Sequence, residues 1–175
     1  MVTRSDFNQF MMPVYKPAEF IPSKAKGSFL WDKNNKIYID FASGIAVSSL
    51  GHCHPLLNKA LTDQSKKIWH LSNALTNEPA LRLAKFFCKH TFAEKVFFSN
   101  SGAEAIEGAV KTARKYAYLN FSKTKNEIVA FSGAFHGRTM MAIALNGSNR
   151  MTEGFGPMPG GIKHHPFNEE KNLEK

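Results

Sequence analysis

The sequence predicts an α/β fold with a parallel sheet, and three consecutive segments lead to that prediction. Residues 95–99 form a short apolar run typical of a buried strand, and residues 127–131 form a second one. Between them, residues 104–119 repeat apolar side chains at helical spacing. Because strand, helix, strand is the order of a parallel α/β unit, we expect functional loops at the carboxyl ends of both strands, at residues 99–103 and 132–138.

The segment before this unit predicts a β-hairpin followed by two helices. Residues 29–41 alternate around Asn34 and Asn35, which tolerate a tight turn, and the proline-rich stretch before them is expected to be extended. A first helix is expected from Pro55 to about Trp69. A second is expected to begin near Asn77, with its apolar face, Leu81, Ala84, Phe87 and Cys88, against a core.

The third helix carries the clearest start signal. Ser101 and Glu104 have the spacing of a capping box. Beyond Asn146 the many glycines and prolines predict loop rather than regular structure. Because a sheet with so few strands would keep an open apolar flank, we expect the chain to be a piece of a larger protein.

Composition indicates a globular protein and bounds its partners. The chain has 175 residues, 43% of them hydrophobic, a formal net charge of +9 and a pI near 9.6. An excess of lysine and arginine favours an anionic partner, so nucleic-acid binding is an alternative. It ranks last, because the lysines are scattered and no base-reading motif accompanies them.

The cysteines and the N-terminus indicate the compartment. Only Cys53 and Cys88 are present, without a Cys-x-x-Cys pair, which favours a reducing cytosol over a disulfide framework. The first residues lack the apolar core of a signal peptide, and no run approaches the roughly 20 apolar residues that cross a bilayer. We expect a cytoplasmic protein with no membrane partner.

A phosphate-binding corner is predicted where the third helix begins. A turn of Ser101, Gly102 and Ala103 that opens directly into a helix presents unpaired N–H groups and the positive end of the helix dipole. Gly102 lets the backbone approach an anion closely. The spacing alone fits equally well a capped helix with no ligand, in which the Ser101 hydroxyl is used for capping.

The second loop combines three kinds of side chain. Phe135 offers an aromatic face, His136 an imidazole and Arg138 a planar fork suited to a carboxylate. Each also has a structural alternative, as core residue, hydrogen-bonded loop residue or surface ion-pair partner. The run of residues 52–54, His-Cys-His, invites a metal site, but Cys88 and His90 supply no recognisable second ligand pair, so a turn before a helix is favoured.

Five motifs together resemble a known family. They are Phe41-Ala42-Ser43-Gly44-Ile45-Ala46-Val47, Gly51-His52-Cys53-His54-Pro55, Thr76-Asn77-Glu78-Pro79, Asn100-Ser101-Gly102-Ala103-Glu104-Ala105 and Phe135-His136-Gly137-Arg138-Thr139. Their order is similar to that in the class III pyridoxal-phosphate-dependent aminotransferases, above all those acting on acylated ornithines. The resemblance spans nearly the whole chain.

The resemblance implies an architecture and a reaction. It implies the N-terminal part of a type I pyridoxal-phosphate fold: residues 1–74 as a hairpin segment of the small domain, and residues 75–175 as an incomplete large domain with a parallel or mixed sheet. It implies a homodimer that moves the terminal amino group of N-acetylornithine, or a related acylated diamino acid, to 2-oxoglutarate in arginine metabolism.

The resemblance also implies the roles of seven residues, and it shows that one functional residue of the family has no match here. Cofactor contacts fall to Ser101, Gly102, Ala103, Phe135 and His136, and substrate contacts to Arg138 for the α-carboxylate and Ile45, whose aliphatic side chain favours an acylated ornithine. The departures, Ile106, Ser43 and the Gly160–Gly161 pair, affect details of the pocket. No lysine here sits in the motif of the family's cofactor-linked lysine, so the chain alone is expected to be inactive.

Two alternatives remain open at this point. One is a noncatalytic fragment that binds phosphate or pyridoxal phosphate through residues 101–103. The other is a different class III transaminase that acts on succinylornithine, ornithine or 4-aminobutyrate.

Overall fold

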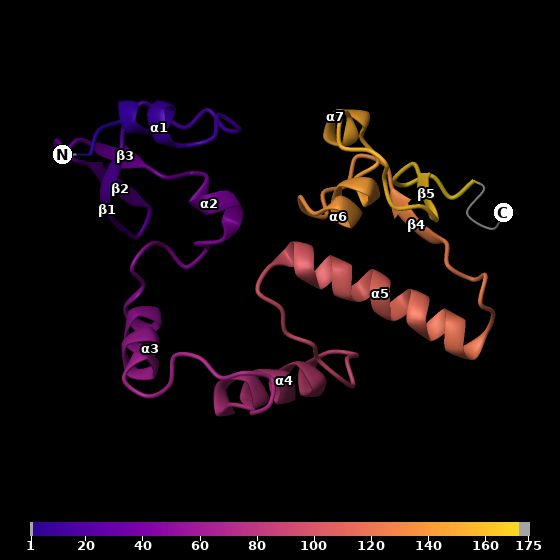
Figure 1. Ribbon diagram of the computed structural model, residues 1–175. Coiled ribbons are helices and arrows are strands. Elements are labelled where there is room, and N and C mark those ends of the chain that lie inside the picture. Colours follow the sequence, from indigo (N-terminus) through magenta and orange to yellow (C-terminus); the bar gives the residue numbers. More distant parts are fainter. Residues whose placement is uncertain (1, 172–175) are drawn as a thin grey trace. The chain divides into compact units, whose positions relative to one another are not determined.

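The computed structural model describes residues 2–171 and divides the chain into two compact units between Thr76 and Asn77 (Figure 1). The division lies close to the boundary expected after residue 74. Whether the two units belong to the small and large domains of a complete aminotransferase stays a prediction.

The first unit is built on a three-stranded antiparallel sheet. Its strands are β1 (Pro22–Lys26), β2 (Phe29–Asp32) and β3 (Ile37–Ile39), in the order β1-β2-β3. The predicted hairpin is confirmed, because β2 pairs with β3 and Asn35 takes the left-handed conformation at φ 61° that the turn requires. The extended segment before the hairpin supplies the third strand.

A buried carboxylate closes this hairpin. Asp32, 7% exposed, accepts hydrogen bonds from the backbone N–H groups of Asn34 (2.8 Å) and Lys36 (3.0 Å) and from the Tyr38 hydroxyl (3.1 Å). Burial alone would raise the pKa of Asp32, but these hydrogen bonds outweigh it and hold the pKa below its usual value. The turn is therefore held by an ionised side chain.

Three helices complete the first unit: α1 (Ser5–Phe10), α2 (Ser43–Ala46) and α3 (Pro55–Ser65). The expected start of α3 at Pro55 is confirmed, but its expected end near Trp69 is wrong. The N–H groups of Lys67 and Ile68 both turn back to the Gln64 carbonyl, and the Trp69 indole donates to the Ser65 carbonyl. The chain thus satisfies the last helical carbonyls with a tight turn and a side chain.

The second unit contains the two longest helices, α4 (Glu78–His90) and α5 (Gly102–Asn120). Both predicted starts are confirmed. The Asn77 side chain accepts from the Ala80 N–H at 2.9 Å, and the Ser101 hydroxyl accepts from the Glu104 N–H at 3.2 Å. These caps satisfy donors that the first helical turn leaves unpaired.

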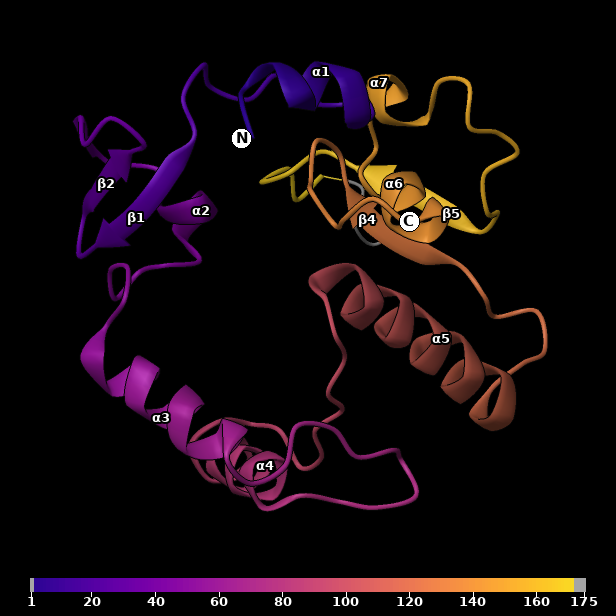
Figure 2. The same ribbon diagram turned by 60° about the vertical axis from the view of Figure 1, so that its left-hand side comes forward.

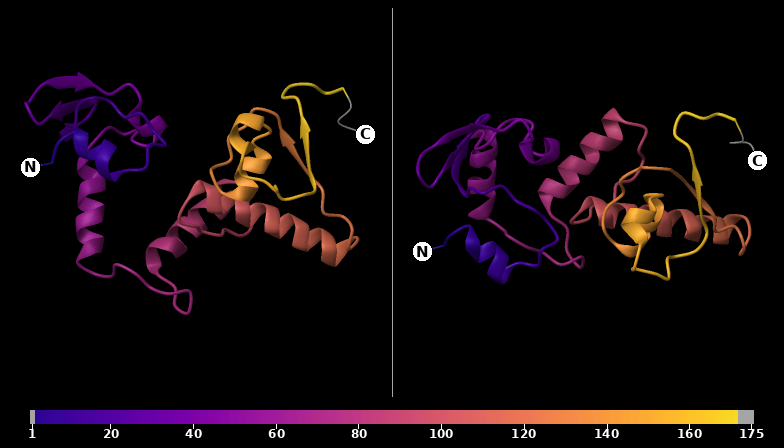
Figure 3. Two further views of the ribbon diagram at one scale, coloured as in Figure 1. Left: turned by 45° about the horizontal axis from the view of Figure 1, so that its top comes forward. Right: turned by 90° about the horizontal axis from the view of Figure 1, so that it is seen from above.

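A parallel strand pair completes the second unit (Figure 3). Strand β4 (Ile128–Phe131) pairs in parallel with β5 (Ile162–His165), and α6 (Met140–Leu145) and α7 (Asn149–Thr152) lie between them in sequence. The prediction of loop structure beyond Asn146 is therefore wrong in part. The glycines and prolines there gave no sign of β5, whose partner strand is distant in sequence. Val110, Ala130 and Leu145, from α5, β4 and α6, form the centre of a small core.

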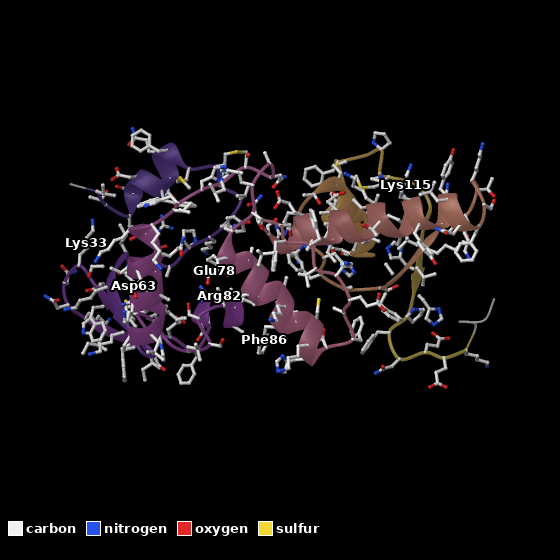
Figure 4. All side chains as sticks on the ribbon, turned by 90° about the horizontal axis from the view of Figure 1, so that it is seen from below. Lys33, Asp63, Glu78, Arg82, Phe86 and Lys115 are labelled. Atoms are coloured by element: carbon white, nitrogen blue, oxygen red, sulfur yellow. The ribbon has the colours of Figure 1, made fainter. Side chains whose placement is uncertain are left out.

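Two further expectations are wrong. Residues 95–99 do not form a strand: no described segment pairs with them, and Phe97 is 81% exposed. The apolar face expected on α4 does not meet a core either, since Leu81 is 57% exposed, Phe87 is 39% exposed and no residue of the helix is buried. The neighbouring Phe86, labelled in Figure 4, is also exposed. Apolar periodicity predicts which face of a helix can pack against a core, but it does not show that such a core is present.

Among residues 2–171, the structure contains no helix with both the length and the apolar character needed to cross a bilayer.

Candidate functional site

The first turn of α5 forms the corner predicted to bind an anion. Ser101 and Glu104 are already paired as a cap, and the Glu104 carboxylate accepts from the Asn100 N–H at 2.7 Å. Within the described residues, the N–H groups of Gly102 and Ala103 have no hydrogen-bond partner. The Ser101 oxygen accepts one hydrogen bond, so its hydroxyl proton is still available to a ligand. Capping and anion binding are therefore compatible.

Gly102 is not required by the fold of the chain itself. Its φ lies outside the left-handed region, and a Cβ added at this position would meet no atom of the described residues within 4 Å. The absent side chain keeps the space in front of two unpaired N–H groups open. These N–H groups, at the positive end of a 19-residue helix, form a donor set that fits a phosphate ester.

The two predicted loops meet at one point of close backbone approach. Gly137 has φ 123°, and a Cβ there would lie 2.7 Å from the Ala103 Cβ and 3.1 Å from the Ala103 Cα. Only glycine fits this position. In Figure 2 the first turn of α5 and the carboxyl end of β4 lie at the same end of the second unit. The loop after β4 is thereby placed against the predicted phosphate corner.

This loop presents its aromatic and cationic side chains outward. Phe135 is 69% exposed, and the Arg138 guanidinium carbon lies 5.6 Å from the centre of its ring. Arg138 forms no ion pair within residues 2–171, so its planar fork has no carboxylate partner there. The His136 side chain is half-buried, and no hydrogen bond to its ring occurs within the same residues.

Sequence reasoning missed the residue that holds the loop. Asn146, 1% exposed, accepts from the His136 backbone N–H at 2.6 Å and donates to the Gly137 carbonyl at 3.4 Å. The amide of this side chain thus pairs with one backbone N–H and one backbone carbonyl. These two hydrogen bonds fix the loop between Phe135 and Arg138, which contains no helix or strand. The only signal in the sequence is an asparagine after an apolar run, which is also typical of a helix end.

The seventh predicted residue, Ile45, belongs to the first unit. It is 93% exposed and lies in α2, where the backbone is left-handed: φ is 48° at Ser43, 63° at Gly44, 60° at Ile45 and 63° at Ala46. An exposed isoleucine in this conformation is unfavourable for two reasons: its apolar side chain is in water, and its backbone is left-handed.

The His-Cys-His run also lies in the first unit, and one of its imidazoles contacts a carboxylate. The His52 Nε2 lies 2.7 Å from the Asp40 Oδ2, and no group of three potential metal ligands occurs in the described part of the chain. A hydrogen bond with His52, and then one from the Ser43 N–H, hold the pKa of Asp40 below its usual value.

The lowered pKa values of Asp32 and Asp40 predict a particular acid response. Their contribution to stability should be full above the pKa of an unfolded aspartate, about 3.9, and should be lost as the pH falls through the lower folded-state values. Heat unfolding followed from about pH 7 to about pH 2 should show this loss in the parent chain, and less of it in Asp32→Asn and Asp40→Asn. The control is Asp63→Asn, in an exposed pair with Lys59. Unchanged pH dependence in both test variants would contradict the pKa directions.

Comparison with known proteins shows the family of the chain. The profile of the family described as aminotransferase class-III matches residues 10–175. An acetylornithine aminotransferase of Vibrio cholerae is 56% identical over 173 residues, which are 99% of this chain and 43% of the relative. A succinylornithine transaminase of Citrobacter koseri is 54% identical over 168 residues, 96% of this chain and 41% of that protein.

The fold has solved counterparts. The crystal structure of an ornithine aminotransferase from Toxoplasma gondii superposes with a TM-score of 0.88 at 28% identity, over 97% of this chain and 41% of that one. The predicted α/β aminotransferase fold is therefore confirmed. The chain spans about 43% of the length of the curated relatives it matches.

Proposed function

The chain belongs to the class III aminotransferases, which depend on pyridoxal phosphate, and from this premise we propose that it carries the cofactor-phosphate and substrate-carboxylate contacts of an acylornithine aminotransferase. One observation carries the proposal. The approach of Gly137 to Ala103 joins two N–H groups to a loop with an exposed phenylalanine and an arginine, and neither these N–H groups nor the arginine has a hydrogen-bond or ion-pair partner among residues 2–171.

The corner fits the phosphate of the cofactor. Gly102 and Ala103 would donate backbone N–H groups and Ser101 its hydroxyl proton, while the helix dipole adds a favourable potential. Phe135 would stack on the pyridine ring, a contact worth about 0.5–1.5 kcal/mol beyond burial, and the half-buried His136 would lie beside it. When bound, the cofactor supplies an electron-withdrawing ring for the amino-group transfer.

Two side chains are proposed to contact the substrate. Arg138 would bind the α-carboxylate through two parallel N–H donors, and this orients the other end of the substrate. Ile45 would contact the substrate chain, where an aliphatic side chain accommodates an acyl group. We propose N-acetylornithine as amino donor and 2-oxoglutarate as acceptor. The similarity to the Citrobacter koseri transaminase makes succinylornithine the second candidate donor.

We further propose that a polypeptide of these 175 residues has no transaminase activity by itself. None of its lysines lies in a motif matching the family's cofactor-linked lysine, which holds the cofactor and moves the proton. Such a polypeptide would bind pyridoxal phosphate without forming a borohydride-stable lysine adduct. A complete enzyme would be a cytoplasmic homodimer, in keeping with the two free cysteines and the many exposed apolar side chains.

A chimera tests the proposed function directly. In it, this chain replaces the matching 43% of the Vibrio cholerae acetylornithine aminotransferase. We expect the chimera to bind pyridoxal phosphate and to transfer the amino group of N-acetylornithine to 2-oxoglutarate. Succinylornithine and ornithine are compared as donors, and the 175-residue chain alone is the control. A chimera that binds the cofactor but uses neither acylated ornithine would contradict the proposed substrate class, and turnover by the chain alone would contradict its proposed inactivity.

A further inference from the structure

The backbone of α2 is the most strained stretch of the first unit. Ser43, Gly44, Ile45 and Ala46 all have φ between 48° and 63°, and three of them carry a side chain. The Ala46 N–H donates to the Ala42 carbonyl at 3.1 Å, so these residues form one left-handed turn. L-residues hold this conformation only where neighbouring groups force it, and such strain gathers at functional sites.

The Asp40 carboxylate is the group that holds the start of this turn. Its Oδ1 accepts the N–H groups of Ala42 at 3.0 Å and Ser43 at 2.9 Å, and its Oδ2 lies 2.7 Å from the His52 Nε2. The Asp40 side chain is only 12% exposed and that of His52 is 25% exposed. One side chain thus fixes the amide of Ala42, just before the left-handed residues, and that of Ser43, the first of them.

His52 is itself fixed to the sheet. Its backbone N–H donates to the Gly27 carbonyl at 2.8 Å, and its carbonyl accepts from the Gly27 N–H at 2.9 Å. Gly51 has φ 84°, and a Cβ there would lie 3.0 Å from the Gly27 Cα. The chain after β1 therefore anchors the imidazole, the imidazole anchors Asp40, and Asp40 anchors the turn.

We propose that Asp40 and His52 are positioning residues that hold Ile45 in place for substrate selection. This inference rests on the proposed function, because it takes Ile45 as a substrate contact. Neither Asp40 nor His52 needs to touch the substrate. They act by keeping three side-chain-bearing residues left-handed, so that the isoleucine side chain stays 93% exposed.

The chimera with Asp40→Ala, Asp40→Asn and His52→Ala tests this role. Asp40→Ala should raise the KM for N-acetylornithine by about tenfold. The free-energy cost of holding one L-residue in the left-handed conformation corresponds to about that factor. His52→Ala should shift the KM in the same direction. Asp40→Asn should stay closer to the parent, because its amide oxygen still accepts both N–H groups. Cofactor absorbance should not change in any of the three.

Asp32 provides the matched control in the same unit. It accepts two backbone N–H groups and a hydroxyl, as Asp40 accepts two N–H groups and faces an imidazole, but it serves the hairpin and not the turn. Asp32→Ala should lower thermal stability and leave the KM for N-acetylornithine unchanged. An equal rise in KM with Asp32→Ala would show that Asp40 acts only through the general stability of the unit, and it would overturn the proposal. An Asp40→Asn variant as impaired as Asp40→Ala would also overturn it.

Hydrogen exchange separates failure of this inference from failure of the proposed function. An inactive parent chimera would count against the function only. In the same protein, exchange in peptides covering residues 42–46 should speed up with Asp40→Ala and not with Asp32→Ala, because only the former releases the Ala42 and Ser43 amides. Unchanged exchange in Asp40→Ala would overturn the inference whatever the activity.

Discussion

Replacing Gly102 by aspartate in the chimera should abolish cofactor binding while leaving the fold intact. The new carboxylate would stand in front of the Gly102 and Ala103 N–H groups, in space that no atom of residues 2–171 occupies. Two unit charges about 4 Å apart repel by about 4 kcal/mol at an effective dielectric constant near 20, which corresponds to about a thousandfold loss of affinity. The measurement is a titration with pyridoxal phosphate followed by absorbance.

The same substitution should not weaken the helix, which makes the result specific. An acidic residue in the first turn of a helix is favourable by about 0.3–1 kcal/mol, so the melting temperature should stay the same or rise. Ala80→Asp, in the first turn of α4, adds the same charge at a helix start with no proposed ligand and should leave the cofactor affinity unchanged. Tight cofactor binding by Gly102→Asp would show that the phosphate lies elsewhere.

The parts of the fold that the sequence predicts well are held by local contacts. The start of α5 depends on Ser101 and Glu104, which are three residues apart, and the hairpin depends on a turn at Asn35 closed by Asp32. Side chain and backbone are neighbours in these cases, so residue type and spacing are sufficient. The same holds for the candidate corner at residues 101–103, whose chemistry is that of a helix start.

The parts that escaped prediction depend on distant partners. Residues 95–99 have the composition of a strand but lack one to pair with in the described chain, whereas β5 has a partner 34 residues earlier in register, Ile128 for Ile162. Strand pairing of this kind is not encoded in a short window. Asn146 escaped for the same reason, because its function depends on two backbone groups about ten residues earlier in a loop without periodicity.

The left-handed turn marks a further limit of sequence reasoning. Gly44 is a residue that favours positive φ, but Ser43, Ile45 and Ala46 are not, and local preference predicts a right-handed conformation for them. Asp40 and His52 override that preference from outside the turn. The conflict between local preference and observed structure coincides with the predicted substrate residue, as expected where function rather than stability sets the backbone.

Arg138→Ala in the chimera should raise the KM for both carboxylate substrates by about a hundredfold. Loss of a bidentate pair removes two charge-assisted hydrogen bonds, together worth about 3 kcal/mol or more. The Arg138 side chain is exposed, and its guanidinium carbon lies 5.6 Å from the centre of the Phe135 ring. It forms no ion pair in the described chain. Its removal therefore leaves no buried charge behind, and the cofactor absorbance and melting temperature should stay close to those of the parent.

Two further variants distinguish carboxylate binding from general charge. Arg138→Lys keeps the charge but loses the planar fork, so its KM should fall between those of the parent and Arg138→Ala. Arg150→Ala removes an exposed arginine from α7 in the same unit and should leave the KM unchanged. Because N-acetylornithine and 2-oxoglutarate each carry a carboxylate at the end away from the reacting carbon, both KM values should rise together. A rise for one substrate alone would place Arg138 at a group that the two do not share, and an unchanged KM for both would remove it from the substrate site.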